Sequence, residues 1–394
     1  MSLNIDALRS ATPGCDHVIH FNNAGAGLMP EPVIDALQGH ITRESIIGGY
    51  EAHAAADDEY QDTYRALEEL LGAKRGEIAL IENATRAWDQ VFYGMAFEPG
   101  DRVVTAQASY ASNYLAMLHQ KKHHQIEIDV VRNDEYGQVD VTALEAALTD
   151  QTRLICLTHI PTNGGLINPA AAVGVIANRA RVPYLLDACQ SVGQVAINVD
   201  EIGCDFLSGT GRKYLRGPRG TGFLYVRTTA LDLIEPPFLD LHAADWTETD
   251  EYVLGPGASR FENWEGFVAG KIALGAAVRY LQELGPEHVF ARIADLAHLL
   301  RGKLNSIDGV SVHDLGLKKG GIVTFSSDKI EAETLQKGLE EAGINVNLAY
   351  PKWAKLDADS RGLPLMIRAS VHAYNSEKEI DEFVDRIAVL SDLR

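Results

Sequence analysis

The strongest constraint on the fold is an alternation of short β-rich runs with helical segments between residues 78 and 226. The runs occupy residues 78–81, 103–106, 126–131, 154–158, 184–186, 206–208 and 223–226. Amphipathic segments, such as 141–148 and 170–180, separate several of them. Strands that alternate with helices form βαβ units, in which a mainly parallel sheet is covered by helices on both faces. This region therefore predicts an α/β fold.

The 394 residues suit two unequal domains better than one. A helical pattern runs from Trp264 to Leu284, and the mixture of helical and strand patterns after it is typical of an α+β domain. Further helices are expected at 287–305 and 332–342, strands near 310–312, 322–326, 346 and 366–370, and a last helix after a capping box of Ser376 and Glu379. We predict a large domain over residues 20–260, a connecting helix over 261–285, and a smaller domain from residues 1–19 and 286–394. Residues 231–256, rich in proline and glycine, are expected to form an irregular loop or crossover.

Composition and charge exclude several classes of protein. Hydrophobic residues make up 46% and charged residues 23%, which is typical of a globular chain. The net charge of −20 argues against binding to nucleic acid or to acidic membranes, because phosphate groups attract basic surfaces. No run of eighteen apolar residues predicts a membrane span, and residues 1–10 lack the apolar core of a signal peptide.

The cysteines and histidines give no sign of a disulfide framework or a metal site. Four cysteines stand at long, irregular spacings, which favours a reducing cytoplasm. His17, His20, His123 and His124 have no carboxylate or cysteine at ligand spacing, so no bound metal is expected.

The segment 208–226 carries the clearest chemical signal, a lysine between two glycine-rich turns. Lys213 stands between an arginine and a tyrosine, so the Gly-Lys-Ser/Thr of a P-loop is absent. The run Gly217-Pro-Arg-Gly-Thr-Gly222 leads into a strand and lacks the spacing of a dinucleotide loop. Two interpretations remain. One is a lysine whose amine condenses with a cofactor aldehyde. The other is a solvated basic patch of Arg212, Lys213, Arg216 and Arg219.

This segment resembles the lysine motif of the class V aminotransferases, a family of pyridoxal-5′-phosphate (PLP) enzymes. The family includes cysteine desulfurases, selenocysteine lyases and isopenicillin N epimerase. Its motif runs Ser/Thr-x-x-Lys, then Gly-Pro-x-Gly-x-Gly, then a strand that ends Leu-Tyr-Val, and Thr210 to Val226 match it with a two-residue variation in the linker. The resemblance extends from Asn22-Asn23-Ala24-Gly25 to the final helix. It implies fold type I, a homodimer, and PLP held by Lys213 as a Schiff base.

Asp187 ends the apolar run 184–187, which is a predicted strand. A carboxylate at the carboxyl end of a buried parallel strand requires a partner, and it points into the crevice where such sheets bind ligands. PLP supplies that partner, since a carboxylate keeps the pyridine nitrogen protonated and the ring electron-withdrawing. The alternative is an aspartate that caps the next helix. The resemblance also implies that Gln190 reaches the ring hydroxyl or the imine.

The turn Asn83-Ala84-Thr85 ends a strand and opens a helix, so its free backbone amides favour a phosphate group. It resembles the Gly-Thr-Thr phosphate turn of the family, with Ala84 and Thr85 in the binding positions. A plain helix cap is the alternative. The other implied contacts are Thr210 and Arg212 at the phosphate, Tyr110 stacked on the ring, and Thr162 or Asn163 beside the ring substituents.

Arg368 lies in the predicted strand 366–370 and requires an anion there. It matches the Arg-x-Ser-x-x-x-Tyr-Asn motif of the family, in which the arginine forms a bidentate pair with the α-carboxylate of an amino acid. An internal salt bridge is the alternative. Asn23 is a second substrate contact implied by the resemblance. Trp264 and Glu265 replace the Gly-Thr of the segment that crosses the family's dimer interface, so the sequence leaves open whether either residue contacts the partner's site.

One departure from the family concerns sulfur. Cysteine desulfurases carry a nucleophilic cysteine on the loop before the arginine strand, and residues 346–365 contain no cysteine. We therefore expect an enzyme that is not a cysteine-nucleophile desulfurase, and any carbon–sulfur cleavage is expected to proceed by β-elimination.

The sequence thus predicts a PLP enzyme in which an amino acid displaces Lys213, forming the external aldimine, and Lys213 then removes the α-proton. A carbon–sulfur β-lyase, an aminotransferase and an epimerase all remain open. An alternative of another class is a non-catalytic binding module that uses the basic patch, against which the net charge argues. The expected partners are a small amino acid and a second copy of the chain, with no nucleic acid and no membrane.

Overall fold

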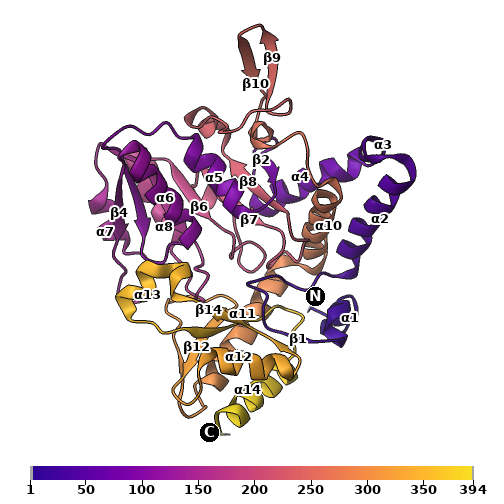
Figure 1. Ribbon diagram of the computed structural model, residues 1–394, viewed down its shortest axis with the longest axis vertical. Helices are drawn as coiled ribbons and strands as arrows, with labels where there is room; N and C mark the ends of the chain where they lie inside the picture. The colour runs from indigo at the N-terminus through magenta and orange to yellow at the C-terminus, as the bar shows by residue number, and fades with distance from the viewer. Residues whose placement is uncertain (1–2, 393–394) are drawn as a thin grey trace.

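The computed structural model describes residues 3–392 and confirms the α/β class. A seven-stranded sheet occupies the larger part of the molecule (Figure 1). In spatial order its strands are β2 (Ile78–Ile81), β8 (Gly222–Val226), β7 (Phe206–Thr210), β6 (Tyr184–Asp187), β5 (Thr152–Thr158), β3 (Arg102–Ala106) and β4 (Glu127–Val131). The strands from β7 to β4 in this order are parallel, whereas β8 is antiparallel to both β2 and β7.

The burial of these strands explains why their sequences are almost continuously apolar. Every residue of β2, β6, β7 and β8 is buried, as expected for strands covered on both faces. Strand β4 lies at the edge of the sheet and remains partly exposed. All seven predicted runs fall on these strands, which confirms that part of the sequence analysis.

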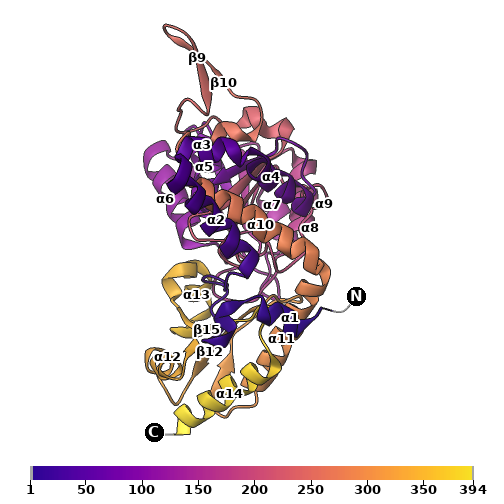
Figure 2. The ribbon, with the colours of Figure 1, turned by 90° about the vertical axis from the view of Figure 1, so that its right-hand side faces the viewer.

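Helices from the same region and from the preceding part of the chain flank the sheet (Figures 1 and 2). Those between the strands are α5 (Ala84–Gly94), α6 (Ala111–His124), α7 (Val141–Ala147), α8 (Ala170–Ala180) and α9 (Val199–Ile202). A second group comprises α2 (Glu31–Ile47), α3 (Gly49–Ala55), α4 (Asp57–Leu71) and α10 (Val268–Leu284), in which α10 packs against α2 and α4. Among residues 3–392, no helix has the length and apolar character that a membrane crossing requires.

A four-stranded antiparallel sheet forms the lower part of the molecule in Figure 1. Its strands, in spatial order, are β11 (Val310–Val312), β12 (Ile322–Ser327), β15 (Met366–Ser370) and β14 (Asn347–Ala349). Around it lie α11 (Pro286–Leu304), α12 (Ala332–Glu341), η4 (Pro351–Ala354), α13 (Lys355–Arg361) and α14 (Glu377–Asp392). Residues 1–2 and 393–394, the two ends of the predicted smaller domain, lie outside the described residues.

The N-terminal segment forms a separate two-stranded sheet with residues more than 300 positions later in the chain, and Asn22 makes an isolated bridge to Ser370 of β15. It contains α1 (Ile5–Ser10), η1 (Pro13–Asp16) and β1 (Ile19–His20), and β1 pairs in parallel with β13 (Ile344–Asn345). The Arg9 guanidinium donates to the Tyr374 carbonyl at 2.8 Å and forms an ion pair with Glu379.

The segment predicted to be irregular contains regular structure. After η2 (Thr228–Leu233), a hairpin of β9 (Ala244–Glu248) and β10 (Glu251–Leu254) projects from the top of the molecule, and η3 (Ala258–Phe261) follows (Figures 1 and 2). The prediction of a loop was wrong here because most residues of the hairpin are exposed. The strands therefore lack the alternation of apolar and polar residues that identifies a half-buried strand.

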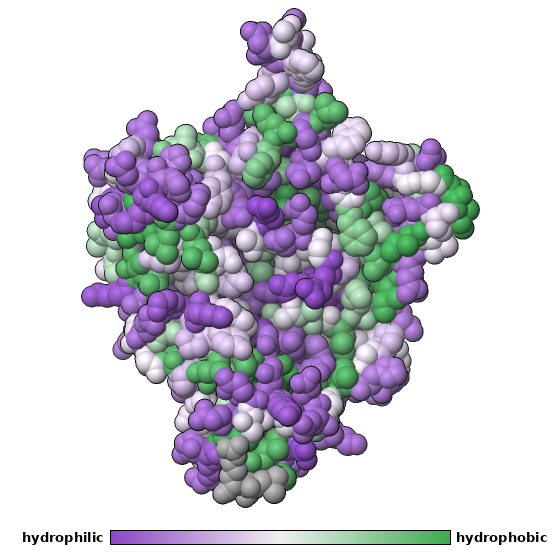
Figure 3. Space-filling model, viewed as in Figure 1, coloured by the Kyte–Doolittle hydropathy of each residue, from purple (hydrophilic) through white to green (hydrophobic). Residues whose placement is uncertain are grey.

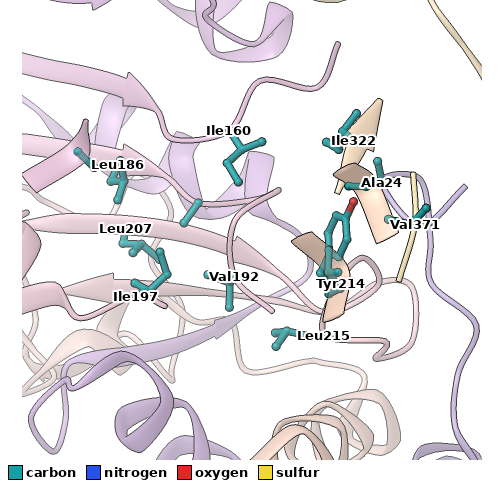
Figure 4. Close-up of a cluster of buried hydrophobic side chains, with 14 of the residues drawn as sticks. Ala24, Ile160, Leu186, Val192, Ile197, Leu207, Tyr214, Leu215, Ile322 and Val371 are labelled. Carbon is teal, nitrogen blue, oxygen red and sulfur yellow. The ribbon is translucent and has the colours of Figure 1, made fainter. Parts of the chain in front are cut away.

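A hydrophobic cluster connects the two sheets. Figure 4 shows Leu186 and Leu207 of the large sheet in the same cluster as Ile322 of the small sheet, with Tyr214 near Ile322 and Val371. Tyr214 is 1% exposed and directly follows Lys213 in the chain. Packing between the sheets therefore fixes the backbone next to Lys213.

Candidate active site

A cavity of about 300 Å³ lies where the strands of the large sheet end, and its size is within the range of small-molecule sites, roughly 300–1,000 Å³. The structure brings together here all nine residues predicted to bind a cofactor. They are Ala84, Thr85, Tyr110, Thr162, Asp187, Gln190, Thr210, Arg212 and Lys213.

Lys213 places a buried amine on the wall of this cavity. The side chain is 7% exposed, and its Nζ donates a hydrogen bond to the Sγ of Cys189 at 3.2 Å. Burial lowers the pKa of the amine, because the charged form loses its hydration. A neutral amine is the form that attacks an aldehyde, so this lysine is suited to Schiff-base formation.

Asp187 is 5% exposed at the carboxyl end of β6. Its Oδ1 accepts the backbone N–H of Cys189 at 3.0 Å, and its Oδ2 accepts the side-chain amide of Asn113 at 2.8 Å. Burial raises the pKa of the carboxyl, whereas the two donors and nearby Lys213 lower it. The arrangement suits a protonated ring nitrogen, which would add a positively charged donor.

We predicted no role for Asn113, although it lies three residues after Tyr110. It belongs to the first turn of α6, and the fold directs its amide to Asp187.

The polar side chains beside Asp187 leave one acceptor free. Gln190 is 3% exposed and donates through Nε2 to the Thr162 hydroxyl at 3.3 Å and to the Ala24 carbonyl at 3.2 Å. Its Oε1 has no partner among the described residues, and a buried acceptor without a partner is costly. A donor on a bound group, such as a ring hydroxyl, would satisfy it.

Another part of the cavity wall has the features of an anion site. Asn83 caps α5 by accepting the N–H of Arg86 at 3.0 Å, and Ala84 and Thr85 follow in the first turn, where helix amides favour a phosphate. Arg212 adds a positive charge to the cavity wall and also donates to the Gly25 carbonyl. The Thr210 hydroxyl donates to the Thr221 carbonyl at 3.2 Å, so its hydrogen is already used.

Arg368 lies on β15, adjacent to the cavity, and is 3% exposed. Its Nη1 donates to the Thr162 hydroxyl at 2.8 Å, and its Nε has no partner among the described residues. Burial lowers the pKa of the guanidinium to about 10. A buried guanidinium whose protein contacts are a hydroxyl and a carbonyl is suited to bind a carboxylate from a ligand.

The structure does not bring Asn23 or Asn163 into the cavity wall. The Asn23 amide donates to the carbonyls of His20 and Ser370, and its oxygen accepts from the Tyr374 hydroxyl. Asn163 donates to the Tyr350 carbonyl at 2.9 Å. Asn23 thus joins the N-terminal segment to β15, and its role in substrate binding stays a prediction.

Cys189, for which we predicted no role, lines the cavity. It follows β6 in a turn that must lie very close to the lysine segment. Gly193, with φ of +92°, makes this approach possible, because a Cβ there would lie 2.5 Å from the backbone of Tyr214.

The residues of the cavity fit PLP, because each reactive or charged group of the cofactor finds a suitable partner among them. The cavity offers an amine for the aldehyde, a buried carboxylate for the ring nitrogen, and a helix N-terminus with an arginine for the phosphate. Among residues 3–392, no group of three or more histidine, cysteine or acidic side chains converges as a metal site.

Known proteins that resemble this chain over nearly its full length are cysteine desulfurases and a PLP-binding protein. A probable cysteine desulfurase of Methanothermobacter thermautotrophicus is 31% identical over 373 residues, which cover 93% of this chain and 92% of that protein. The apo structure of a cysteine desulfurase from Thermococcus onnurineus has a TM-score of 0.92 at 25% identity and covers 100% of this chain and 99% of that one. A variant of C-DES with glycine covalently linked to its PLP cofactor shares the fold, with a TM-score of 0.87 at 23% identity over 96% and 98% of the two chains.

The comparison corrects one expectation. The absence of a cysteine from residues 346–365 led us to exclude a cysteine-nucleophile desulfurase, and that exclusion is wrong, because the similar proteins are cysteine desulfurases. The composition of one loop does not determine whether a thiol is available, since the fold brings Cys189 into the cavity from another part of the chain.

The family assignment rests on nearly the full length of the chain. The sequence model of the aminotransferase class-V family matches residues 19–383, which include both sheets and every residue of the cavity wall. The chain belongs to the class V aminotransferase family, and its cofactor is pyridoxal 5′-phosphate.

Proposed function

We propose that this enzyme cleaves the carbon–sulfur bond of cysteine or a closely related amino acid, as a cysteine desulfurase does. The observation that carries the amino-acid part is the buried guanidinium of Arg368, which has no carboxylate partner among the described residues and contacts Thr162 of the cavity wall. The sulfur part is supported by the similar proteins, which are cysteine desulfurases.

Arg368 serves substrate binding, whereas Lys213 and Asp187 serve the chemistry at the α-carbon. Arg368 would bind the α-carboxylate and so hold the amino group of the substrate next to Lys213. Lys213, a buried amine with a lowered pKa, is positioned to take the α-proton. PLP, when bound, withdraws electrons from the α-carbon, and Asp187 keeps its ring nitrogen protonated.

The alternatives are less favoured. An aminotransferase or an epimerase would also use Lys213 and Arg368, but two of the similar proteins reported above are named cysteine desulfurases. A binding module would need a solvated basic patch, and Arg216 is 3% exposed, with its guanidinium bonded to the Leu28 carbonyl and the Thr12 hydroxyl. Lys213 is buried as well, Arg212 is partly buried and only Arg219 of the four is exposed, so the patch is not a solvated basic surface.

Product analysis tests the proposal. Purified enzyme with PLP is incubated with L-cysteine and a thiol reductant, and sulfide, alanine, pyruvate and ammonia are measured. We expect sulfide release together with a three-carbon product. Lys213→Ala should abolish it, whereas Lys318→Ala, which removes an exposed lysine far from the cavity in sequence, should leave it unchanged. Amino transfer to a keto acid without any sulfide release would refute the proposal.

We further propose that two copies associate. Large apolar side chains are exposed around the hairpin, including Phe238, Leu241, Trp246 and Trp264, and others on α2 and α3 give the hydrophobic right-hand edge in Figure 3. Exposed apolar surface of this extent favours a protein interface. Sedimentation equilibrium should give twice the mass of the chain, and a monomer at micromolar concentration would contradict the proposal.

A further inference from the structure

The four cysteines occupy very different environments. Cys156 lies on β5 and Cys204 before β7, with exposed fractions of 3% and 0%, and burial raises the pKa of both thiols. Cys15 lies on η1, outside the cavity, and burial also raises its pKa. Cys189 alone among the four lines the cofactor cavity, and it is partly exposed there. It is therefore the one thiol that a small molecule in the cavity can meet.

The contacts of Cys189 fix its position relative to the reacting groups. Its backbone N–H is bonded to Asp187 at 3.0 Å, and its Sγ lies 3.2 Å from the Nζ of Lys213. The amine to which a cofactor aldehyde would be joined is thus the direct neighbour of the thiol. An amine at this distance can exchange a proton with the sulfur.

A second observation shows that the same wall is built for a ligand. Gln190, the next residue, is 3% exposed and lines the cavity with an Oε1 that has no partner among the described residues. Its Nε2 and the Nη1 of Arg368 both donate to the Thr162 hydroxyl. Arg368 and the amide of Gln190 thus share the Thr162 hydroxyl, and the thiol belongs to the residue before Gln190 in the cavity wall. We expect an amino acid held by its carboxylate at Arg368 and by its nitrogen near Lys213 to direct its side chain towards these groups.

We propose that Cys189 is the sulfur acceptor of this enzyme, an inference that rests on the proposed desulfuration. Lys213, once it has passed on the α-proton, takes the proton of the Cys189 thiol, and the thiolate attacks the sulfur of the substrate cysteine. The new sulfur–sulfur bond forms as the bond between the β-carbon and sulfur breaks, and the electron pair of the broken bond stays with the carbon skeleton. Lys213 returns the thiol proton to the β-carbon and the α-carbon regains its proton, so alanine leaves and Cys189 carries a persulfide. The carbon gains the two electrons that the sulfur atoms lose. Two further thiols then become a disulfide as they release the extra sulfur as sulfide and regenerate the Cys189 thiol.

Mass spectrometry after a single turnover tests the assignment. The holoenzyme is mixed with one equivalent of L-cysteine without reductant, then alkylated and digested. The peptide that contains Cys189 should gain the mass of one sulfur atom, dithiothreitol should remove it, and the peptides of Cys15, Cys156 and Cys204 should not change. Sulfur on another cysteine, or alanine produced with no sulfur on Cys189, would overturn the inference.

Matched variants give an independent readout. Cys189→Ser should keep the near-visible absorbance of bound PLP and lose alanine formation by about 100-fold or more. Cys15→Ser should behave as the wild type. If Cys189→Ser does not take up PLP, Cys189→Ala serves the same purpose, and the labelling of the wild type requires no variant.

The two proposals fail in different ways. Wild-type enzyme that releases neither sulfide nor a three-carbon product from L-cysteine would refute the proposed function. Wild-type enzyme that releases sulfide with pyruvate and ammonia, or a Cys189→Ser variant that forms alanine at the wild-type rate, would overturn the role of Cys189 and leave the proposed function in place.

Discussion

At the scale of single residues, the cavity depends on polar atoms whose partners the protein supplies only in part. Asp187 receives two hydrogen bonds, from Asn113 and from the backbone of Cys189, yet burial still raises its pKa. Gln190 and Arg368 each keep one buried polar atom without a partner among the described residues. Because such atoms are costly in an apolar surrounding, they indicate where a cofactor and a substrate complete the site.

The charge of Asp187 is expected to control the removal of the α-proton. Asp187→Asn should still bind PLP through Lys213, but exchange of the α-proton of an amino acid should slow by at least about 100-fold, since a neutral ring stores electrons poorly. Proton NMR in deuterated buffer measures this exchange whatever the later chemistry is. Asp205→Asn is a matched control, because Asp205 is a partly buried carboxylate that bonds the Tyr184 N–H. Equal exchange rates in the Asp187 variant and the wild type would contradict the role.

Arg368 is expected to select amino acids over simple amines. Arg368→Ala should weaken amino-acid binding by about 100-fold, because a desolvated charged hydrogen-bonded pair is lost. An amine of the same length without a carboxylate should bind the variant and the wild type equally well. Titrations followed by the absorbance of bound PLP give both affinities. If the amine and the amino acid lose affinity to the same extent, the arginine has a structural role instead.

At the scale of elements, the sequence was most informative where burial imposes a pattern. The strands of the large sheet were predicted because their residues are apolar on both faces, and the helix α14 because Ser376 and Glu379 form the capping box. The hairpin β9–β10 was missed because its residues are mostly exposed and satisfy no pattern. Elements that do not contribute to a core leave little periodicity in the sequence.

The same reasoning separates the parts of the site that were predictable from those that were not. Lys213 and Asp187 belong to continuous sequence motifs, so the resemblance to a family was enough to predict their roles. Cys189 and Asn113 gain their importance from contacts with residues 24 and 74 positions away, respectively. Only the fold brings these partners together. The absence of a cysteine from residues 346–365 therefore did not show whether a thiol reaches the cavity.

The capping box at the start of α14 provides a test of local stability. The N–H of Glu379 donates to the Ser376 hydroxyl at 3.2 Å, and the N–H of Ser376 donates to the Glu379 carboxylate at 3.0 Å. Ser376→Ala should lower the free energy of opening of this helix by about 1 kcal/mol. Native-state hydrogen exchange of the α14 amides measures the change. Ser360→Ala, at an exposed position of α13, should change the exchange of α14 very little, and equal protection in both variants would contradict the prediction.

At the scale of the whole molecule, two buried histidines make stability depend on pH. Burial lowers the pKa of His159 to about 4 and that of His372 to about 3, from an ordinary value of 6.5. The unfolded chain therefore binds more protons than the folded one as the pH falls below 6.5. The free energy of unfolding should decrease from about pH 6.5 towards pH 4, with each histidine adding a slope of up to about 1.4 kcal/mol per pH unit.

His159→Gln should remove the slope that belongs to this histidine. The variant is expected to be less stable at neutral pH, because a buried side chain has changed, but its stability should fall less steeply between pH 6.5 and 4. Urea unfolding at several pH values gives the slope separately from the absolute stability. A slope identical to that of the wild type would show that His159 does not titrate in this range.

The pairing of β1 with β13 has a consequence for how the chain is made. Arg9 and β1 leave the ribosome more than 300 residues before their partners, which lie at residues 344–345 and 374–379. Gly27 and Gly25 also bond to Arg212, which belongs to the cofactor cavity. The large sheet can form while synthesis continues, but residues 9–20 cannot make these contacts until residues 344–379 have emerged. The cavity is therefore completed late, and the nascent chain passes through a stage in which Lys213 is present while the wall beside it is still missing.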